Sequence, residues 1–300
     1  MTLSERDTPS AGSAYFKAHG LGNDYLVFES GDDWVLDAER IMAVCDRWRG
    51  PGSDGIVLLL DRVSRPFPLR MFNPDGSEFE RSGNGLRILG AFLAREGLAG
   101  DEPFDVSVGG DTVRLHVVGP PERGLYEISA EMGPAGHGPE AVGLDPGVLD
   151  ADHRLDLGGA GRPVIHPVSI GNPHAVVFPE DWERELIDEI GPRISGHPAF
   201  ADGTNVQVAR VLDGRTLEAR IWERGVGPTS ASGTSACAVA AAAVKSGRAT
   251  PGKFEVRMDG GSMEVTVTAA MEITLTGPVQ EVSRGTLTRG FLEFLAALEG

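Results

Sequence analysis

Two long apolar stretches stand out along the chain, and each follows the same kind of short polar motif. Residues 236–244 are apolar on every side, which is typical of a helix that is buried all round. Residues 86–98 are nearly as apolar. The motif SGNG begins at Ser82, just before the first stretch, and SGTS begins at Ser232, 150 residues later. The pattern predicts two buried helices, one in each half of the chain.

The other apolar positions form short runs between Gly and Pro residues, which is typical of strands. The predicted strands cover residues 104–108, 113–118, 126–130, 254–258, 263–268 and 271–276. Residues 259–261 (DGG) predict a hairpin turn between two of them. Amphipathic spacing predicts outer helices at residues 37–49, 180–190 and 290–298.

The two halves also repeat one another outside these motifs. At the same offset, Phe104 matches Phe254 and Gly110 matches Gly260. A period this long indicates a duplicated domain, because solenoid repeats run to roughly 20–50 residues. We therefore expect an α/β protein of the α+β type. It has two pseudo-symmetric domains, each a curved mixed sheet wrapped around a central apolar helix, with the active site at the domain junction.

Domain boundaries follow from the repeat and from the composition. We expect a disordered tail over residues 1–13, an N-terminal domain made of residues 14–131 and 277–300, and a C-terminal domain of residues 132–276. Residues 132–144 are rich in Gly and Pro and are expected to form the crossover.

Composition excludes several classes of partner. Lys and Arg total 27 against 44 Asp and Glu, a formal net charge of −17, which disfavours nucleic acid and anionic membranes. No apolar run is long enough to span a membrane, and the N-terminus is too polar and acidic for a signal peptide. Cys45 and Cys237 are the only cysteines and form no CxxC motif, so neither a disulfide framework nor a zinc site is indicated. We expect a cytoplasmic protein without a metal.

The two predicted helix starts are candidate anion sites. Free N–H groups and partial positive charge at a helix N-terminus hold carboxylates or phosphates, and glycine permits close approach. Gly83, Asn84, Gly233 and Thr234 are therefore candidate ligand contacts. A serine before a helix is often an ordinary N-cap, but the repeat in register favours a site.

Four asparagines lie in loops flanked by Gly or Pro: Asn23, Asn73, Asn172 and Asn205. Singly, each is typical of a turn, but two of the four recur by symmetry, which favours a shared site. Glu223 and Arg224 lead into a Gly-rich loop, where an arginine suits bidentate carboxylate binding and a surface ion pair is the alternative.

Other catalytic motifs are absent or misplaced. Residues 50–55 match GxGxxG, but they follow a helical stretch and precede a strand, the reverse of the dinucleotide-binding order. Neither a P-loop nor a GxSxG nucleophile elbow is present. His19 and His174 lie beside the candidate loops, so a Ser-His hydrolase stays formally possible, although no spacing demands it.

Taken in order, the motifs resemble the diaminopimelate epimerase family. They are HGLGNDY from His19, NPDGS from Asn73, GNG from Gly83, GNPH from Gly171, GTNV from Gly203, ERG from Glu223 and GT from Gly233. The resemblance runs from about residue 16 to residue 285 and implies two epimerase-like domains.

This resemblance implies inversion at an amino-acid α-carbon without a cofactor, most directly the conversion of LL- to meso-diaminopimelate, a precursor of lysine and cell wall. It also suggests a homodimer. It implies that the substrate is held by Asn23, Asn73, Asn172, Asn205, Glu223 and Arg224, and that the two helix starts bind its α-carboxylate.

The chain departs from the family at its two reactive positions. Family members carry cysteine where Ser82 and Ser232 stand, one acting as thiolate base and the other as thiol acid. Cys45 and Cys237 do not occupy those places. A thiol titrates near 8.5 and lower at a helix N-terminus, whereas serine needs a neighbouring base. We therefore expect substrate binding to survive and epimerisation to fall by orders of magnitude.

Three interpretations stay open. The chain is an epimerase whose cysteines were replaced by serine on purpose, or a natural Ser/Ser homologue with another amino-acid isomerase chemistry, using His174 or Glu223 as base. The third is a non-catalytic amino-acid-binding protein that kept the pocket. The codons of the encoding gene separate the first from the others. Gly55 offers no side chain to the distal end of a substrate, so other amino acids stay open.

Overall fold

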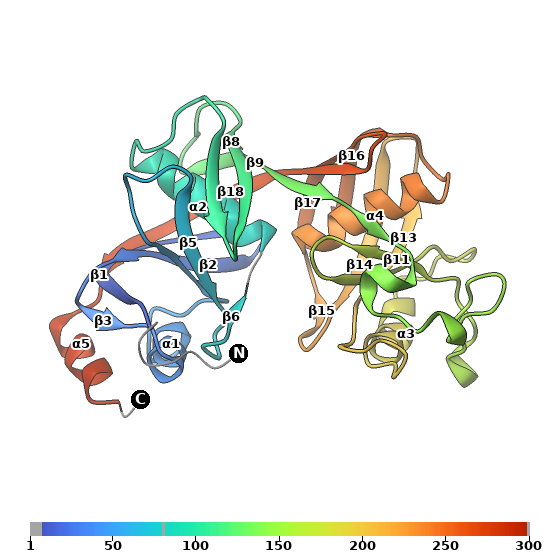
Figure 1. Ribbon diagram of the computed structural model, residues 1–300, viewed down its shortest axis with the longest axis horizontal. Coiled ribbons are helices and arrows are strands. Elements are labelled where there is room, and N and C mark those ends of the chain that lie inside the picture. Colours follow the sequence, from blue (N-terminus) through green and yellow to red (C-terminus); the bar gives the residue numbers. More distant parts are fainter. Residues whose placement is uncertain (1–7, 80–81, 299–300) are drawn as a thin grey trace. The chain divides into compact units, whose positions relative to one another are not determined.

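The computed structural model describes residues 8–79 and 82–298. The chain divides into two compact units (Figure 1). Unit 1 consists of Met1–Ala130 and Pro278–Gly300, and unit 2 consists of Glu131–Gly277. The chain therefore passes from one unit to the other twice.

The sheet of unit 1 is mixed. Its strands are β1 (Ser10–Gly20), β2 (Asn23–Ser30), β3 (Trp34–Val35), β4 (Ile56–Leu59), β5 (Phe67–Phe72), β6 (Glu78–Phe79), β7 (Phe104–Val108), β8 (Asp111–Val117), β9 (Leu125–Pro134) and the second half of β18 (Glu272–Thr286). β2 pairs parallel with β4, and β5 with β7, whereas β1 pairs antiparallel with both β2 and β18. Pairing of β9 with β18 closes the sheet.

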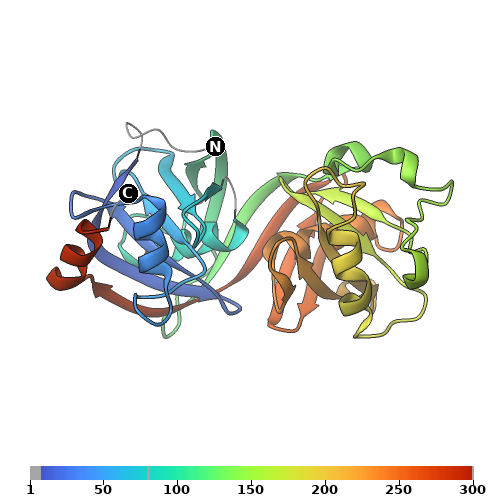
Figure 2. The ribbon, with the colours of Figure 1, turned by 90° about the horizontal axis from the view of Figure 1, so that it is seen from below.

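Unit 1 buries apolar residues on both faces of this sheet. On one face, helix α2 (Gly83–Arg95) packs against β1, β2 and β8, and it is buried from its first residue to Leu93. The other face is covered by α1 (Ala38–Cys45) and α5 (Arg289–Ala296), which contribute to one core with β2 and β4. Figure 2 shows α1 and α5 over the same part of unit 1, where Arg40 Nε donates to the carbonyl of Leu295 at 2.8 Å.

Unit 2 repeats this plan. Its elements are β10 (Gly136–His137), three short 3-10 helices at Pro139–Val142, Pro146–Val148 and Gly158–Ala160, β11 (His166–Ser169), β12 (Pro173–Val177), α3 (Leu186–Ser195), β13 (Asn205–Val211), β14 (Thr216–Glu223), β15 (Gly227–Thr229), α4 (Gly233–Lys245), β16 (Gly252–Met258), β17 (Gly261–Val267) and the first half of β18. The parallel pairs are β12 with β13 and β14 with β16. Helix α4 packs against strands of one face, and α3 covers a core on the other.

Register makes the correspondence between the units residue-specific. In unit 1, Leu26 of β2 lies opposite Ile56 of β4. In unit 2, Ala175 of β12 lies opposite Val206 of β13. Helices α2 and α4 have 13 residues each and begin 150 positions apart. Two elements with the same neighbours and the same pairing therefore occupy equivalent places, and residue 25 corresponds to residue 174.

Most expected elements are confirmed. Both buried helices begin directly after Ser82 and Ser232, and residues 259–261 lie in the β16–β17 hairpin, where Met258 pairs with Gly261. The mixed α+β class is confirmed as well.

Three expectations were wrong in detail. Residues 10–13 of the expected tail belong to β1, because Ser10 and Ala11 pair with β3; residues 1–7 lie outside the described residues. The helix expected over 37–49 ends at Cys45, since the Asp46 carboxylate accepts from the amides of residues 48 and 49 and forms a turn instead. The helix expected over 180–190 begins only at Leu186, while Trp182 packs into the unit 2 core.

Within the described part of the chain, no helix is both long and apolar enough to cross a membrane.

Candidate active site at two helix starts

The start of α2 is organised around the hydroxyl of Ser82. Ser82 has the extended backbone of an N-cap (φ −132°, ψ 117°), and its Oγ accepts a hydrogen bond from the amide of Gly85 at 3.1 Å. The Tyr25 phenol, from β2, donates to the same Oγ at 3.4 Å. Tyr25 is buried and Ser82 is half-buried. The Ser82 hydroxyl is thus held by a strand residue as well as by its own helix.

Asn84 fixes the same helix start from its other side. Its Nδ2 donates to the carbonyl oxygen of Asn23 at 2.7 Å and to Asn23 Oδ1 at 2.8 Å. Its Oδ1 accepts from the guanidinium of Arg87 at 2.9 Å, and Arg87 is fully buried. A Cβ at Gly20 would lie 2.0 Å from Asn84 Oδ1, so only glycine leaves room for this amide. We call Ser82, Tyr25, Asn84 and Asn23 the Ser82 cluster.

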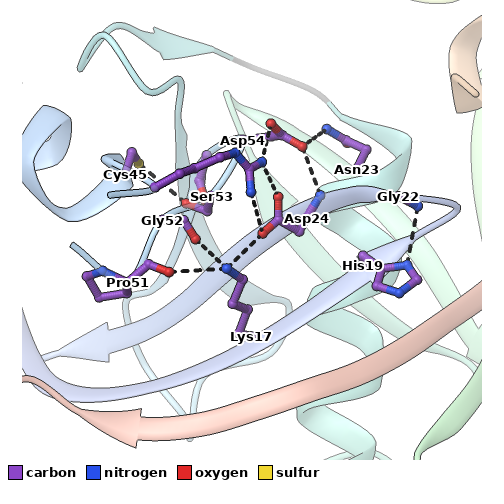
Figure 3. Close-up of polar contacts among 12 residues, drawn as sticks. Lys17, His19, Gly22, Asn23, Asp24, Cys45, Pro51, Gly52, Ser53 and Asp54 are labelled. Carbon is purple, nitrogen blue, oxygen red and sulfur yellow. Dashed lines mark hydrogen bonds and ion pairs between the residues drawn. The ribbon is translucent and has the colours of Figure 1, made fainter. Parts of the chain in front are cut away.

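An ionic network of Lys17, Asp24, Arg47 and Asp54 holds the side chain of Asn23 (Figure 3). Asp54 Oδ2 accepts from Asn23 Nδ2 at 3.0 Å and from the amide of Asp24 at 3.1 Å. Arg47 bridges the two carboxylates, at 2.6 Å to Asp24 and 2.7 Å to Asp54, and Lys17 lies 3.1 Å from Asp24. Burial opposes ionisation of Asp24, but its bonds to Arg47 and Lys17 outweigh burial and lower the pKa of its carboxyl group. The network therefore stays ionised and anchors Asn23.

Two further candidates of unit 1 make local contacts. Asn73 follows β5, and its Nδ2 donates to Ser77 Oγ at 2.9 Å, which holds the turn into β6. The half-buried His19, near the end of β1, accepts from the amide of Gly22 through Nδ1 at 3.3 Å (Figure 3). Neither contact joins these residues to the Ser82 cluster.

The start of α4 has the same backbone and different chemistry. Ser232 has the N-cap conformation (φ −149°, ψ 129°), but its side chain makes no capping hydrogen bond within the described residues. Gly233 is buried, and a Cβ there would lie 2.8 Å from Leu275. Ser235, fully buried in the first turn of the helix, accepts instead from Gln207 Nε2 at 2.9 Å. In unit 2 the strand contact therefore falls on Ser235 and not on the N-cap.

His174 is the centre of this second arrangement. It is fully buried; its Nε2 lies 2.8 Å from Asn172 Oδ1, and its Nδ1 lies 3.0 Å from Gln207 Nε2. Burial lowers the pKa of His174 to about 3. A neutral ring that donates from Nε2 and accepts at Nδ1 satisfies both neighbours. We call Ser232, Ser235, Gln207, His174 and Asn172 the Ser232 cluster.

Asn205, Glu223 and Arg224 make contacts that connect the loops of unit 2. Asn205 Nδ2 donates to the carbonyl of Pro173 at 2.9 Å, and its Oδ1 accepts from the amide of Arg224 at 3.0 Å. The Arg224 guanidinium is exposed and donates to the carbonyl of Asp202 at 2.8 Å. The Thr229 hydroxyl donates to Glu223 Oε2 at 3.3 Å. Asn205 thus positions the loop that presents Arg224.

Neither cysteine lies at a helix start. Cys45 ends α1, is buried beside Ser53 at 3.4 Å, and burial raises its pKa to about 11. Cys237 is fully buried inside α4. A thiol with a raised pKa is a poor base at neutral pH.

The Ser82 cluster, the ionic network beside it and the Ser232 cluster contain residues that the sequence analysis did not name as candidates. Tyr25, Asp54, Gln207 and Ser235 hold the expected residues in place. Tyr25 lies inside the HGLGNDY motif. Its position corresponds to that of His174, a candidate residue, and this correspondence could have pointed to Tyr25. Among the described residues, no three His, Cys, Asp or Glu side chains are grouped to hold a metal ion.

Comparison with known sequences identifies the family. The family model for diaminopimelate epimerase matches residues 15–137 and 167–282. Diaminopimelate epimerase 2 of Nostoc sp. is 38% identical over 279 residues, which cover 91% of this chain and 95% of the relative. Diaminopimelate epimerase of Desulforudis audaxviator is 36% identical over 211 residues, covering 66% and 71%.

Solved structures share the fold at lower identity. An epimerase-like protein of Pseudomonas aeruginosa superimposes with a TM-score of 0.62 at 22% identity, covering 92% of this chain and 99% of that one. A hydroxyproline epimerase of Agrobacterium vitis, solved with bound trans-4-hydroxy-L-proline, gives a TM-score of 0.62 at 18% identity, covering 91% of both chains. With a matching family model over most of its length and a full-length relative at 38% identity, the chain belongs to the diaminopimelate epimerase family.

Proposed function

We propose that this protein is a cofactor-independent amino-acid isomerase that acts on stereoisomers of diaminopimelate, in a cytoplasmic lysine and cell-wall precursor pathway, as a homodimer. Membership of the family supports the reaction class, and the names of the relatives support the substrate. In this proposal Ser82 and Ser232 stand at the two positions where the resemblance places the acid and the base of the reaction.

The repeated helix start carries the proposal. In both units an extended serine is followed by a buried glycine and a fully packed helix. The first amides of a helix have no partner inside the helix and carry partial positive charge, which suits an α-carboxylate. We assign the carboxylate to the amides of Gly83, Asn84, Gly233 and Thr234.

The remaining contacts are assigned by the resemblance. We propose that the rest of the substrate is held by Asn23, Asn73, Asn172, Asn205, Glu223 and Arg224. Since Asn23 and Asn205 already donate to protein acceptors, they would act mainly by shaping the pocket and presenting their neighbours. The exposed guanidinium of Arg224 suits a second carboxylate.

Two other bases were open on sequence grounds, and they differ in suitability. His174 suits the role poorly, because both of its ring nitrogens are engaged and its pKa is lowered to about 3. Glu223, which accepts from the Thr229 hydroxyl, therefore remains the candidate base for a natural Ser/Ser chemistry. A non-catalytic binding protein is favoured by one observation: Ser232 has no side-chain capping bond in the described part of the chain.

Calorimetry and proton exchange test the proposal together. We expect meso- and LL-diaminopimelate to bind the protein as it stands, and a chain without affinity for either contradicts the proposal. The double variant Ser82→Cys and Ser232→Cys should exchange the α-proton of diaminopimelate in deuterated water at least ~10²-fold faster than the parent. If the double variant binds and exchanges no faster than the parent, the chain is a binding protein or uses another base.

A further inference from the structure

The hydroxyl of Ser82 is saturated as an acceptor. A serine hydroxyl has one donor hydrogen and two acceptor lone pairs. The amide of Gly85 occupies one lone pair at 3.1 Å, and the phenol of Tyr25 occupies the other at 3.4 Å. The hydrogen of Ser82 is therefore the part of this group that stays available to a ligand.

The Tyr25 ring is held in position to make this bond. It is 6% exposed, and the backbone just before β4 approaches it so closely that a Cβ at Gly55 would lie 2.6 Å from the ring. A phenol titrates near 10 and is a much stronger acid than an aliphatic alcohol, so Tyr25 is the natural donor of the pair. The Gly85 amide also donates to Ser82 Oγ at the helix N-terminus, and it continues to stabilise charge there after the phenol has lost its proton.

Resting on the proposed function, we propose that Tyr25 acts through Ser82 as a proton relay, which makes the Ser82 cluster the single working acid/base group of this chain. Serine needs a neighbouring group to take its proton, and Tyr25 touches it. Tyr25 is here a positioning and relay residue; Ser82 is the group that meets the substrate.

The relay transfers protons between water, Tyr25, Ser82 and the substrate. Water or hydroxide first removes the phenolic proton of Tyr25. Ser82 Oγ then takes the α-hydrogen of the substrate as a proton, while the original hydroxyl proton of Ser82 moves to the phenolate oxygen. The Cα–H bond breaks, and its electron pair stays on the substrate, delocalised into the carboxylate. One O–H bond forms on each of the two residues, and the reverse sequence returns a proton to the same face.

Unit 2 offers no equivalent of this relay. The residue that corresponds to Tyr25 is His174, which contacts Asn172 and Gln207. Gln207 in turn donates to Ser235, and Ser232 makes no capping bond from its side chain in the described residues. A base therefore acts on only one face of the substrate α-carbon. The α-hydrogen then exchanges with solvent, and the configuration is retained.

Charged groups around Tyr25 bear on its titration. The elements packed around it carry Lys17 and His19 on β1, Asp24 on β2, Asp54 before β4, Arg70 on β5 and Arg87 on α2. Lys17, Asp24 and Asp54 are joined in the ionic network, and neighbouring residues of a strand point to opposite faces, so Asp24 points away from Tyr25. Arg70 pairs with Glu78, and Arg87 donates to Asn84.

Deuterium exchange tests the relay with a matched pair of variants. The probes are LL- and meso-diaminopimelate in deuterated water, followed by NMR and by chiral separation. For the parent protein we expect exchange that rises with pH, because Tyr25 must first lose its phenolic proton, and that exceeds the rate of inversion. Tyr25→Phe, which keeps the ring and its packing, should lower exchange by about 10²-fold and lose this pH dependence. Tyr126→Phe removes the hydroxyl of another buried tyrosine of unit 1 and should behave as the parent does.

The outcomes separate the relay from the proposed function. If Tyr25→Phe folds, binds and exchanges with the parent's rate and pH profile, the relay is overturned. It is also overturned if the parent binds diaminopimelate but exchanges nothing at any pH, or if inversion is as fast as exchange. As a second probe, a fluorinated tyrosine at position 25, whose phenol is more acidic, should move the profile to lower pH. Absence of binding to the parent defeats the proposed function instead.

Discussion

Units 1 and 2 build the same helix start and place different chemistry beside it. In unit 1 a strand residue, Tyr25, donates to the N-cap hydroxyl of Ser82. In unit 2 the corresponding residue, His174, is buried between two amides, and the strand contact of Gln207 reaches Ser235. The two units share the backbone frame of the helix start, whereas the polar contacts beside it differ.

The same contrast continues one turn further into the helices. Position 87 in α2 is a fully buried arginine, and the corresponding position 237 in α4 is a fully buried cysteine. Arg87 orders Asn84, and through it Asn23, whereas α4 carries Thr234 at the position of Asn84. Unit 1 therefore orders its helix start by ionic and amide contacts, and unit 2 by close apolar packing around a neutral histidine.

Low pH should give the largest difference in stability between the two units, because unit 2 should be destabilised before unit 1. The folded pKa of His174 is about 3, below the unfolded value of 6.5, so the unfolded chain takes up the proton first. The stability that the neutral His174 ring contributes is complete above pH 6.5. It is lost as the pH falls toward 3, at about 1.4 kcal/mol of unfolding free energy per pH unit. Asp24 also has a lowered pKa, but its contribution is lost only below about pH 4.

Hydrogen exchange between pH 7 and pH 4.5, resolved by unit, measures this effect. We expect amides of unit 2 to lose protection by about 3 kcal/mol while those of unit 1 keep theirs. His166, whose pKa burial lowers to about 4, adds to the effect in unit 2. His174→Gln, which removes the titrating ring, should reduce it. Earlier loss of protection in unit 1 would contradict the comparison.

Substitutions of Arg87 and Cys237 should give the next largest difference in unfolding free energy. Arg87→Met keeps much of the side-chain volume but leaves Asn84 Oδ1 without its donor, and we expect a loss of about 3 kcal/mol of unfolding free energy. Cys237→Ala removes one small buried group and should cost about 1 kcal/mol. Urea unfolding of both variants measures the difference, and equal losses would show that Arg87 acts by volume alone.

The fold was predictable because its signals are local. Strands at residues 104–108 and 254–258 and the start of α4 after Ser232 follow directly from alternation, from an all-apolar helix and from an N-cap. The failures at helix ends have local causes too, such as the turn that Asp46 forms with its own backbone. Capping by a side chain of this kind competes with helix propagation, and periodicity does not register it.

The candidate site was predictable only in part. The helix starts and the asparagine loops carry turn residues at fixed spacing, so the motifs find them. The partners of Ser82 and Ser235 depend on which strand faces which helix, and Tyr25 and Gln207 have no local signature. The role of His174 was likewise hidden, because only burial and the two amide contacts make it neutral.

Gly20 tests whether the Ser82 cluster needs its close approach to β1. Gly20→Ala would place a Cβ 2.0 Å from Asn84 Oδ1, and we expect a loss of about 2 kcal/mol together with weaker ligand binding. Gly12→Ala on the same strand meets nothing closer than a carbonyl at 3.8 Å and should change stability by less than about 0.5 kcal/mol. Unit 2 carries Ser169 at the position of Gly20, so the constraint is specific to unit 1. If the two alanine variants are equally stable, Asn84 can move without cost and the cluster is less ordered than its contacts indicate.

The smallest difference lies in the two serines themselves. Ser82→Ala removes a hydroxyl that accepts from Gly85 and Tyr25, and loss of an N-cap bond costs about 1 kcal/mol. Ser232→Ala removes a hydroxyl without a capping bond in the described residues and should cost only a few tenths of a kcal/mol. Urea midpoints of the two variants, measured at one pH and without ligand, give the comparison. Equal costs would mean that Ser232 caps α4 in solution, and the two helix starts would then be alike in both backbone and side chain. A clear excess for Ser82→Ala would instead place the difference between the units at the two N-cap serines themselves, before any ligand is bound.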